Sequence, residues 1–260
     1  MSGTRSPSPR APATNVLIVA HGQPSDPGPA EVNMEQFADQ VSDLLPGRPV
    51  KGLTLALPGA LEQALAECTS PPMIYPLFMS DGWFTAHALP KRLNGVEARI
   101  LDPLGLDPGL PALACDYIQR TAASRKWSSD QVTLILAAHG SGRSRNPARA
   151  TNSFVSALRS SIALMGIRIG FVEEDPLIED VARDAGSQSI CLPFFAAIGG
   201  HVRHDIPRAL TKAGFVGEIL EPIGVAPQIP ALVANAIVQA ERSGPQSSAL
   251  DLELIDCRRD

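Results

Sequence analysis

The chain contains an internal repeat, which restricts its fold more than any other feature. The stretch NVLIVAHGQPSDP from Asn15 resembles TLILAAHGSGRSRNP from Thr133, and YPLFMSDGWFTAHALPKRL from Tyr75 resembles LPFFAAIGGHVRHDIPRAL from Leu192. The separations agree: 118 positions from His21 to His139, and 117 positions from Pro90 to Pro207. A constant shift across separate motifs indicates two duplicated, domain-sized halves, since the period is far too long for a solenoid repeat.

Each half alternates short apolar runs with amphipathic patterns. In the second half we expect strands near 131–138, 168–173, 188–195 and 217–220, and helices near 147–165, 175–186, 201–214 and 227–242. In the first half we expect strands near 15–20, 51–56, 72–78 and 98–101. Continuous apolar strands joined by helices are typical of a parallel sheet covered on both faces. We therefore predict an α/β protein of two similar domains, each a parallel sheet flanked by helices, with an active cleft between them.

This pattern divides the chain into four predicted segments. Residues 1–13 are polar and rich in proline and serine, without the apolar stretch of a signal peptide, so we expect a disordered arm there. Residues 14–127 form the N-terminal half and residues 128–242 the C-terminal half. We expect residues 243–260 to be a loosely held tail.

Composition excludes several classes of function. The 260 residues carry a net charge of −5, which argues against a non-specific nucleic-acid binder, and no apolar run reaches the roughly 18 residues of a membrane span. The cysteines are scattered without a CxxC pair, which argues against a thiolate metal site: Cys68, Cys115, Cys191 and Cys257. We expect a cytoplasmic protein that binds neither nucleic acid nor membrane. A monomer is expected because both halves lie in one chain, with a homodimer as the alternative.

Three candidate metal ligands follow three consecutive strands of the second half. His139 ends the first of these strands, Glu173 the second, and His201 comes after the third and its Gly199-Gly200 turn. The carboxyl ends of parallel strands meet at one edge of a sheet, where open α/β sheets bind ligands. Two imidazoles and one carboxylate suit cobalt, nickel, iron or zinc and leave coordination positions open.

Each of these residues has a structural alternative. His139 could cap a turn through a hydrogen bond. Glu173 and Glu174 could be solvated residues that complement the start of the following helix. His204 lies three positions after His201 and is as consistent with a surface residue or a supporting residue as with a ligand.

The first half keeps only part of this pattern. Alignment of the repeats places Phe84 opposite His201 and Leu55 opposite Glu173, whereas His21 matches His139. We therefore predict a degenerate site in the first half and the chemistry in the second. His21 and His87 are expected to line the shared cavity.

Positive charge also gathers near the predicted site. The basic residues concerned are Arg143, Arg145, Arg149, Arg203, Arg208 and Lys212. Arginine forms bidentate hydrogen bonds with carboxylates and phosphates, and a loop that meets a helix N-terminus also favours anions. We predict a polyanionic substrate held by Ser141, Arg143, Arg145, Gly199, Gly200, Arg203 and His21.

At these residues the sequence resembles the CbiX-type chelatases, in the long form with two tandem halves. The segments that carry the resemblance are LAAHGSGRSRNP, GFVEEDP and LPFFAAIGGHVRHDIPRAL. The resemblance implies that His139 and His201 are metal-binding and catalytic histidines, with Glu173 as the accompanying acid. It also implies insertion of a divalent metal into sirohydrochlorin, a polycarboxylate tetrapyrrole, in cobalamin or siroheme synthesis.

No P-loop motif occurs, so we expect no ATP requirement, and we expect no organic cofactor. The metal is a co-substrate, with Co²⁺ preferred and Fe²⁺ or Ni²⁺ as alternatives, because the ligand set does not choose among them. Two further hypotheses are a non-catalytic metal or tetrapyrrole carrier and, less favoured, a hydrolase that uses the loop after His139. The hydrolase lacks support because no G-x-S-x-G motif occurs.

Overall fold

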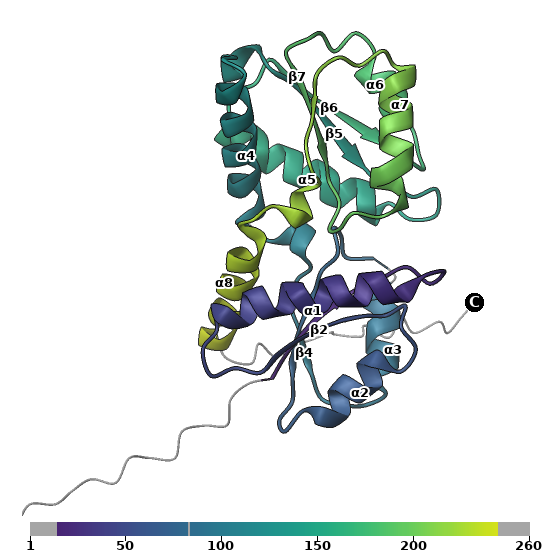
Figure 1. The fold of residues 1–260 in the computed structure, drawn as a ribbon, viewed down its shortest axis with the longest axis vertical. Coiled ribbons are helices and arrows are strands. Elements are labelled where there is room, and N and C mark those ends of the chain that lie inside the picture. Colours follow the sequence, from purple (N-terminus) through teal and green to yellow (C-terminus); the bar gives the residue numbers. More distant parts are fainter. Residues whose placement is uncertain (1–14, 83, 244–260) are drawn as a thin grey trace, which may run out of the picture.

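The computed structural model describes residues 15–82 and 84–243, which form two lobes stacked along the long axis (Figure 1). Each lobe is built on a four-stranded parallel sheet with helices on both faces, which confirms the predicted fold class. The predicted arm at 1–13, all but the first residue of the predicted tail at 243–260, and Cys257 lie outside the described residues.

The first lobe contains the sheet with the order β2-β1-β3-β4. Its strands are β1 (Val16–Ala20), β2 (Val50–Thr54), β3 (Met73–Pro76) and β4 (Arg99–Ile100). The helices between them are α1 (Pro27–Asp43), α2 (Ala60–Glu67) and α3 (Leu89–Leu93), the last preceded by a π-helical turn at Phe84–Ala88.

The second lobe repeats this order as β6-β5-β7-β8. Its strands are β5 (Thr133–Ala138), β6 (Gly166–Phe171), β7 (Ser189–Pro193) and β8 (Glu218–Ile219). The helices between them are α5 (Asn146–Ser161), α6 (Ile178–Ala182) and α7 (Ile206–Lys212), the last again preceded by a π-helical turn, at His201–Asp205. The shared strand order and the two π-helical turns support the duplication inferred from the sequence.

Alternating side chains of each central strand pack into different cores, as expected of strands buried on both faces. In β1, Val16 and Ile18 join a core that continues through both lobes, whereas Leu17 and Val19 face α2 and α3. β5 divides its residues in the same way, between the continuous core and a smaller one against α6 and α7.

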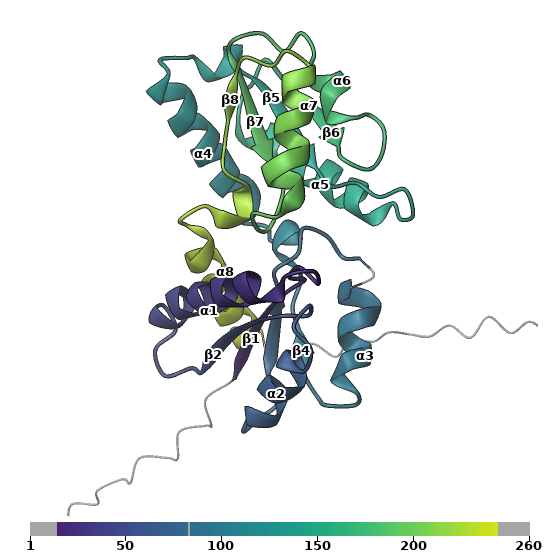
Figure 2. The same cartoon turned by 45° about the vertical axis from the view of Figure 1, so that its right-hand side comes forward.

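The final helix of each half packs in the opposite lobe. Helix α4 (Leu110–Ser124) ends the first half of the chain but lies against α5, and α8 (Ile229–Arg242) ends the second half but lies beside α1 (Figures 1 and 2). Arg48 of the first lobe pairs with Glu241 at the end of α8 at 2.7 Å. The continuous core contains residues of both exchanged helices. Sequence halves and spatial lobes therefore differ by these two helices.

The carboxyl ends of the two sheets face each other across the junction between the lobes (Figure 2). Asn146, at the start of α5, donates a hydrogen bond from its side-chain amide to the carbonyl oxygen of Asp81, which follows β3. Arg149 of α5 pairs with the Asp81 carboxylate at 3.5 Å. The loops that follow the strands thus bring the lobes into contact beside the predicted site.

Several boundaries differ from the sequence prediction. The helix expected at 175–186 spans only Ile178–Ala182, because the chain turns through Asp184, whose φ of 56° is left-handed.

Cys191 is completely buried, and burial raises the pKa of its thiol to about 12, so it behaves as an apolar core residue. None of the helices in the described part of the chain is both long and apolar enough to cross a bilayer.

Candidate metal centre

His139, Glu173 and His201 converge at the carboxyl edge of the second sheet. His139 directly follows β5, Glu173 lies two residues beyond β6, and His201 opens the π-helical turn before α7. One donor atom from each side chain lies within 4.8 Å of the other two. The side chains are 46%, 49% and 37% exposed, so an ion and a large ligand can both reach them.

The His139 ring is fixed by its own loop. Its Nδ1 lies 2.8 Å from the carbonyl oxygen of Gly140, and because that oxygen can only accept, Nδ1 carries the proton. The Nε2 lone pair is therefore left available for a metal. Gly140 has a φ of +71°, and a Cβ there would lie 2.8 Å from Glu174, so only glycine fits this turn.

The two acidic residues after β6 take different positions. The backbone amide of Glu173 donates to the carbonyl oxygen of His139 at 3.0 Å, and its carboxylate lies 3.7 Å from His139 Nδ1. Glu174 instead accepts a hydrogen bond from the backbone amide of Ser141 at 2.9 Å. Because α6 begins only at Ile178, neither residue lies in its first turn, and the helix-start alternative is wrong for both.

The His201 ring packs edge-on against His139. The ring centroids are 4.7 Å apart with an interplanar angle of 87°, and Phe195 lies 6.3 Å from both rings. His201 Nδ1 is 2.7 Å from a carboxylate oxygen of Asp205 and donates its proton there. Nε2 is again the nitrogen that is left free to bind.

These donor atoms can form an open coordination site. Ligands held at about 2.1 Å from one ion are at most about 4.2 Å apart, so small rotations of these exposed side chains would close the group around an ion. Three protein ligands leave positions for water or for the nitrogens of an incoming ligand. Within the described residues, no other set of three histidine, cysteine or acidic side chains is placed closely enough to hold a metal.

The first lobe keeps the first histidine of this arrangement but neither the second histidine nor the carboxylate. His21 donates from Nδ1 to the Gly22 carbonyl oxygen at 2.8 Å, as His139 does to Gly140. The Phe84 ring packs edge-on against His21, with ring centroids 4.2 Å apart and an interplanar angle of 87°. Phe84 thus takes the place that His201 has beside His139 in the second lobe. The predicted match of Leu55 with Glu173 is wrong by one residue: Ala20 pairs with Thr54 and Ala138 with Phe171, so the position of Glu173 corresponds to Ala56.

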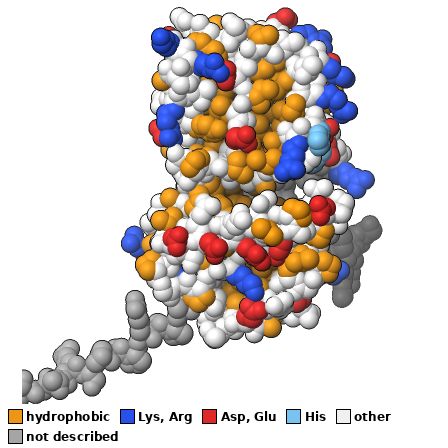
Figure 3. Space-filling view, viewed as in Figure 1, with side chains coloured by type: hydrophobic (Ala, Val, Ile, Leu, Met, Phe, Trp, Pro, Cys, Tyr) orange, Lys and Arg blue, Asp and Glu red, His pale blue; other side chains and the backbone are white. Residues whose placement is uncertain are grey.

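The predicted basic residues fall into two groups. Arg143, Arg145 and Arg203 are exposed on the loops that carry His139 and His201. Arg149, Arg208 and Lys212, which were not among the predicted substrate-binding residues, pair with Asp81, Asp205 and Glu179. On the face seen in Figure 3, basic side chains lie along both edges of the upper lobe, whereas acidic ones form a row across the lower lobe.

The remaining predicted residues lie around the same loops. Ser141 is partly buried, and its hydroxyl accepts hydrogen bonds from the backbone amides of Arg143 and Ser144 at 3.2 Å each. A Cβ at Gly199 or Gly200 would meet nothing within 4 Å, so the packing of the loop does not require glycine at either position. His87 and His204 are exposed and do not belong to the group of potential ligands.

Asp205 and Glu174 form hydrogen bonds at the site and were not predicted as site residues. Asp205 binds His201, and Glu174 holds the loop after His139. The contact of Asp205 with His201 could have been predicted, because residues four positions apart lie next to each other on a helix. Glu174 had no comparable signal, because the strand-end turn that aims it at Ser141 is irregular.

The comparison with protein families decides the classification. The CbiX family model matches residues 15–121 and, a second time, residues 133–240. The chain belongs to the CbiX family. The two matches coincide with the two halves of the internal repeat.

Individual relatives agree with this classification. The solved structure of CbiX, described as the terminal enzyme for biosynthesis of siroheme in denitrifying bacteria, is 47% identical with a TM-score of 0.80, covering 87% of this chain and 99% of that one. SirB from Bacillus subtilis with Fe³⁺ is 16% identical and has the same fold, with a TM-score of 0.71 over 89% of this chain and 98% of that one.

A curated relative is the probable sirohydrochlorin cobaltochelatase of Halobacterium salinarum (strain ATCC 700922 / JCM 11081 / NRC-1). It is 24% identical over 160 residues, 52% of this chain and 55% of that protein. The match therefore spans about half the length of the curated relative.

Proposed function

We propose that this CbiX-family chain inserts a divalent first-row metal ion into sirohydrochlorin without ATP, at the site formed by His139, Glu173 and His201. One observation carries the proposal: these three side chains bring their donor atoms within 4.8 Å of one another at the end of the second sheet. The first lobe offers one histidine and no carboxylate in the corresponding positions. The chemistry is therefore assigned to the second lobe.

The reaction requires the ion to lose water, the macrocycle to be oriented, and two pyrrole N–H protons to leave. The Nε2 atoms of His139 and His201 hold the ion in an incomplete coordination sphere, and the tetrapyrrole nitrogens replace the remaining ligands and then the histidines. Glu173 stands 3.7 Å from His139 and accepts one of the two pyrrole protons, and a histidine released as the metal transfers accepts the other. The metal is a substrate, and no organic cofactor takes part.

The surrounding loops supply contacts for a polycarboxylate. Arg143, Arg145 and Arg203 are exposed beside the two histidines and pair with acidic side chains of the macrocycle. The open space beside Gly199 and Gly200 lets the macrocycle approach the backbone closely. Ser141 and His21 complete the proposed substrate contacts.

The relatives suggest which metals to compare. One is named a probable cobaltochelatase and another is described as an enzyme of siroheme biosynthesis, so Co²⁺ and Fe²⁺ are both to be compared. Co²⁺ remains our first choice and Fe²⁺ the alternative. Ni²⁺ is a third option with the same ligand preferences. A monomer acting in the cytoplasm, without nucleic acid or membrane, remains our expectation for the working form.

The test is anaerobic metallation of sirohydrochlorin in large excess over the protein, with Co²⁺ and with Fe²⁺ in separate reactions, followed by absorbance. We expect many turnovers per chain and a rate well above the spontaneous one, and the faster metal identifies the pathway. If the protein binds metal or tetrapyrrole without acceleration, it is a carrier and the enzymatic proposal is wrong. Hydrolysis of generic esters without metallation would favour the hydrolase.

A further inference from the structure

Asp205 accepts a hydrogen bond from Nδ1 of His201, the ring nitrogen that is not free to bind a metal. One of its carboxylate oxygens accepts the His201 Nδ1 proton at 2.7 Å, and the other lies 3.3 Å from the Arg208 guanidinium. The two residues are four positions apart on the π-helical turn that opens α7. The Asp205 side chain is 34% exposed, so this hydrogen bond is partly shielded from water.

This contact gives the two histidines different support. His139 donates its Nδ1 proton to the neutral carbonyl oxygen of Gly140, whereas His201 donates to a carboxylate. A carboxylate behind a metal-binding imidazole fixes the tautomer and the ring orientation and makes the opposite nitrogen a stronger donor.

The two halves of the chain provide an internal comparison. At a shift of 117 positions, His201 corresponds to Phe84 and Asp205 to Ala88, so the histidine and its carboxylate are replaced together. Other parts of the same segment are kept, including the π-helical turn itself. The hydrogen bond of His139 to its own loop is also repeated, by His21. The fold of this turn therefore does not need the aspartate.

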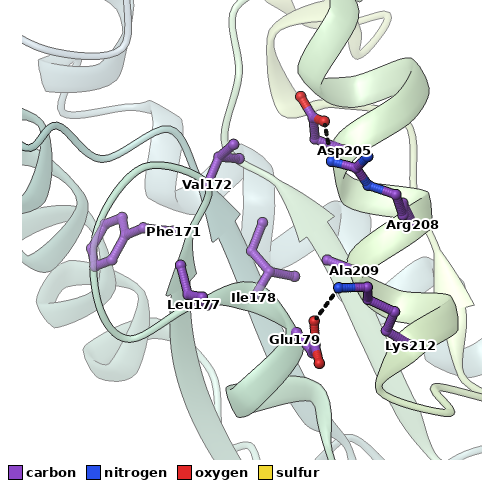
Figure 4. A pocket seen from close by; sticks show the side chains of 9 residues that line it. All are labelled: Phe171, Val172, Leu177, Ile178, Glu179, Asp205, Arg208, Ala209 and Lys212. Carbon is purple, nitrogen blue, oxygen red and sulfur yellow. Dashed lines mark hydrogen bonds and ion pairs between the residues drawn. The ribbon is translucent and has the colours of Figure 1, made fainter.

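We propose that Asp205 is a positioning residue that holds His201 for metal capture, an inference that rests on the proposed function. Asp205 also borders a pocket between α6 and α7, in which Arg208 pairs with Asp205 and Lys212 with Glu179 (Figure 4). The pocket measures about 140 Å³, too small for a tetrapyrrole, since ligand pockets are typically about 300–1,000 Å³. Asp205 therefore acts by positioning His201 and not by binding the tetrapyrrole in this pocket.

The test is anaerobic titration of the full chain with Co²⁺ alone, read from visible absorption, together with steady-state metallation. We expect Asp205→Ala to raise the Kd for Co²⁺ by about 10–100-fold, the range for lost outer-shell partners. It should also raise the KM for Co²⁺ and leave the KM for sirohydrochlorin unchanged. Asp205→Asn keeps the size and an acceptor oxygen but loses the charge, and should fall between Asp205→Ala and wild type.

Glu179→Gln is the matched control, because it removes a carboxylate of similar exposure from the same pocket, one that pairs with Lys212 and not with either histidine. We expect its Kd for Co²⁺ to stay at the wild-type value. If Asp205→Ala does not fold, as judged by circular dichroism, Asp205→Asn decides.

Wild-type Co²⁺ affinity in the folded Asp205 variants would overturn the inference, as would an equal loss in Glu179→Gln. The proposed function fails separately, if the wild-type chain does not accelerate metallation, and the Co²⁺ titration still measures the contribution of Asp205 in that case.

Discussion

Replacing His139 or His201 by alanine is expected to lower kcat/KM for metallation of sirohydrochlorin by more than about 100-fold, because outer-shell partners of metal ligands alone contribute about 10–100-fold. Either change removes one of the two nitrogen donors and leaves a site that cannot hold the ion while the macrocycle displaces it. Both side chains are more than a third exposed, so the fold should survive. The measurement is initial rate against concentration for each substrate, under anaerobic conditions.

His204→Ala is the matched control for these variants. It removes an exposed histidine from the same π-helical turn, three residues from His201, and outside the group of potential ligands. We expect its rate to match that of wild type. Full activity in His139→Ala or His201→Ala, or an equal loss in His204→Ala, would contradict the assignment of the site.

Gly224→Ala is expected to destabilise the protein by about 2–3 kcal/mol, at the upper end of the usual cost of overpacking. The Gly224 amide donates to the Phe195 carbonyl oxygen at 2.9 Å, and a Cβ there would lie 2.4 Å from the Ala196 backbone. That segment leads from β7 to His201, so its displacement should also lower the rate of metallation. Thermal unfolding should show a midpoint roughly 4–12 °C below that of wild type.

Gly166→Ala serves as the control for this prediction, because a Cβ at Gly166 meets nothing within 4 Å. Its free energy of unfolding should change by less than about 0.5 kcal/mol. The first lobe repeats the close contact: Gly105 donates to the Phe78 carbonyl oxygen, and its Cβ would meet Met79. A Gly224→Ala protein with the wild-type midpoint would show that this contact does not hold the loop.

The sequence predicts the sheets and the site well, because both depend on local patterns. The apolar runs before His21 and His139 mark the central strands, and the repeat fixes the correspondence between the halves. Parallel strands then bring His139, Glu173 and His201 to one edge whatever the details of the helices. The structure confirms this convergence; the role of the three residues in catalysis remains a prediction.

The exchange of α4 and α8 was not predictable in the same way. Amphipathic periodicity reports that a helix buries one face, but not against which sheet. Ile118 of α4 and Ile237 of α8 would read as core residues in either lobe. Only the tertiary arrangement, in which the Arg48 side chain reaches Glu241, places α8 beside the first sheet.

Register and side-chain direction set the other differences. An alignment of Pro58 with Pro176 places Leu55 opposite Glu173, whereas the strand register relates Ala56 to Glu173. The irregular turn after β6 aims Glu174 at Ser141, which no periodic pattern describes. Arg208 meets Asp205 three positions earlier on its own helical segment, whereas Lys212 lies on the side of α7 that faces Glu179 of α6.

The most direct test of the central claim is anomalous diffraction at the cobalt absorption edge from crystals soaked with Co²⁺. We expect one strong peak in the second lobe, at bonding distance from Nε2 of both His139 and His201 and beside the Glu173 carboxylate. No peak is expected beside His21, where Phe84 replaces the second histidine. A peak at His21 with none at His139, or no ordered cobalt in either lobe at saturating concentration, would contradict the account.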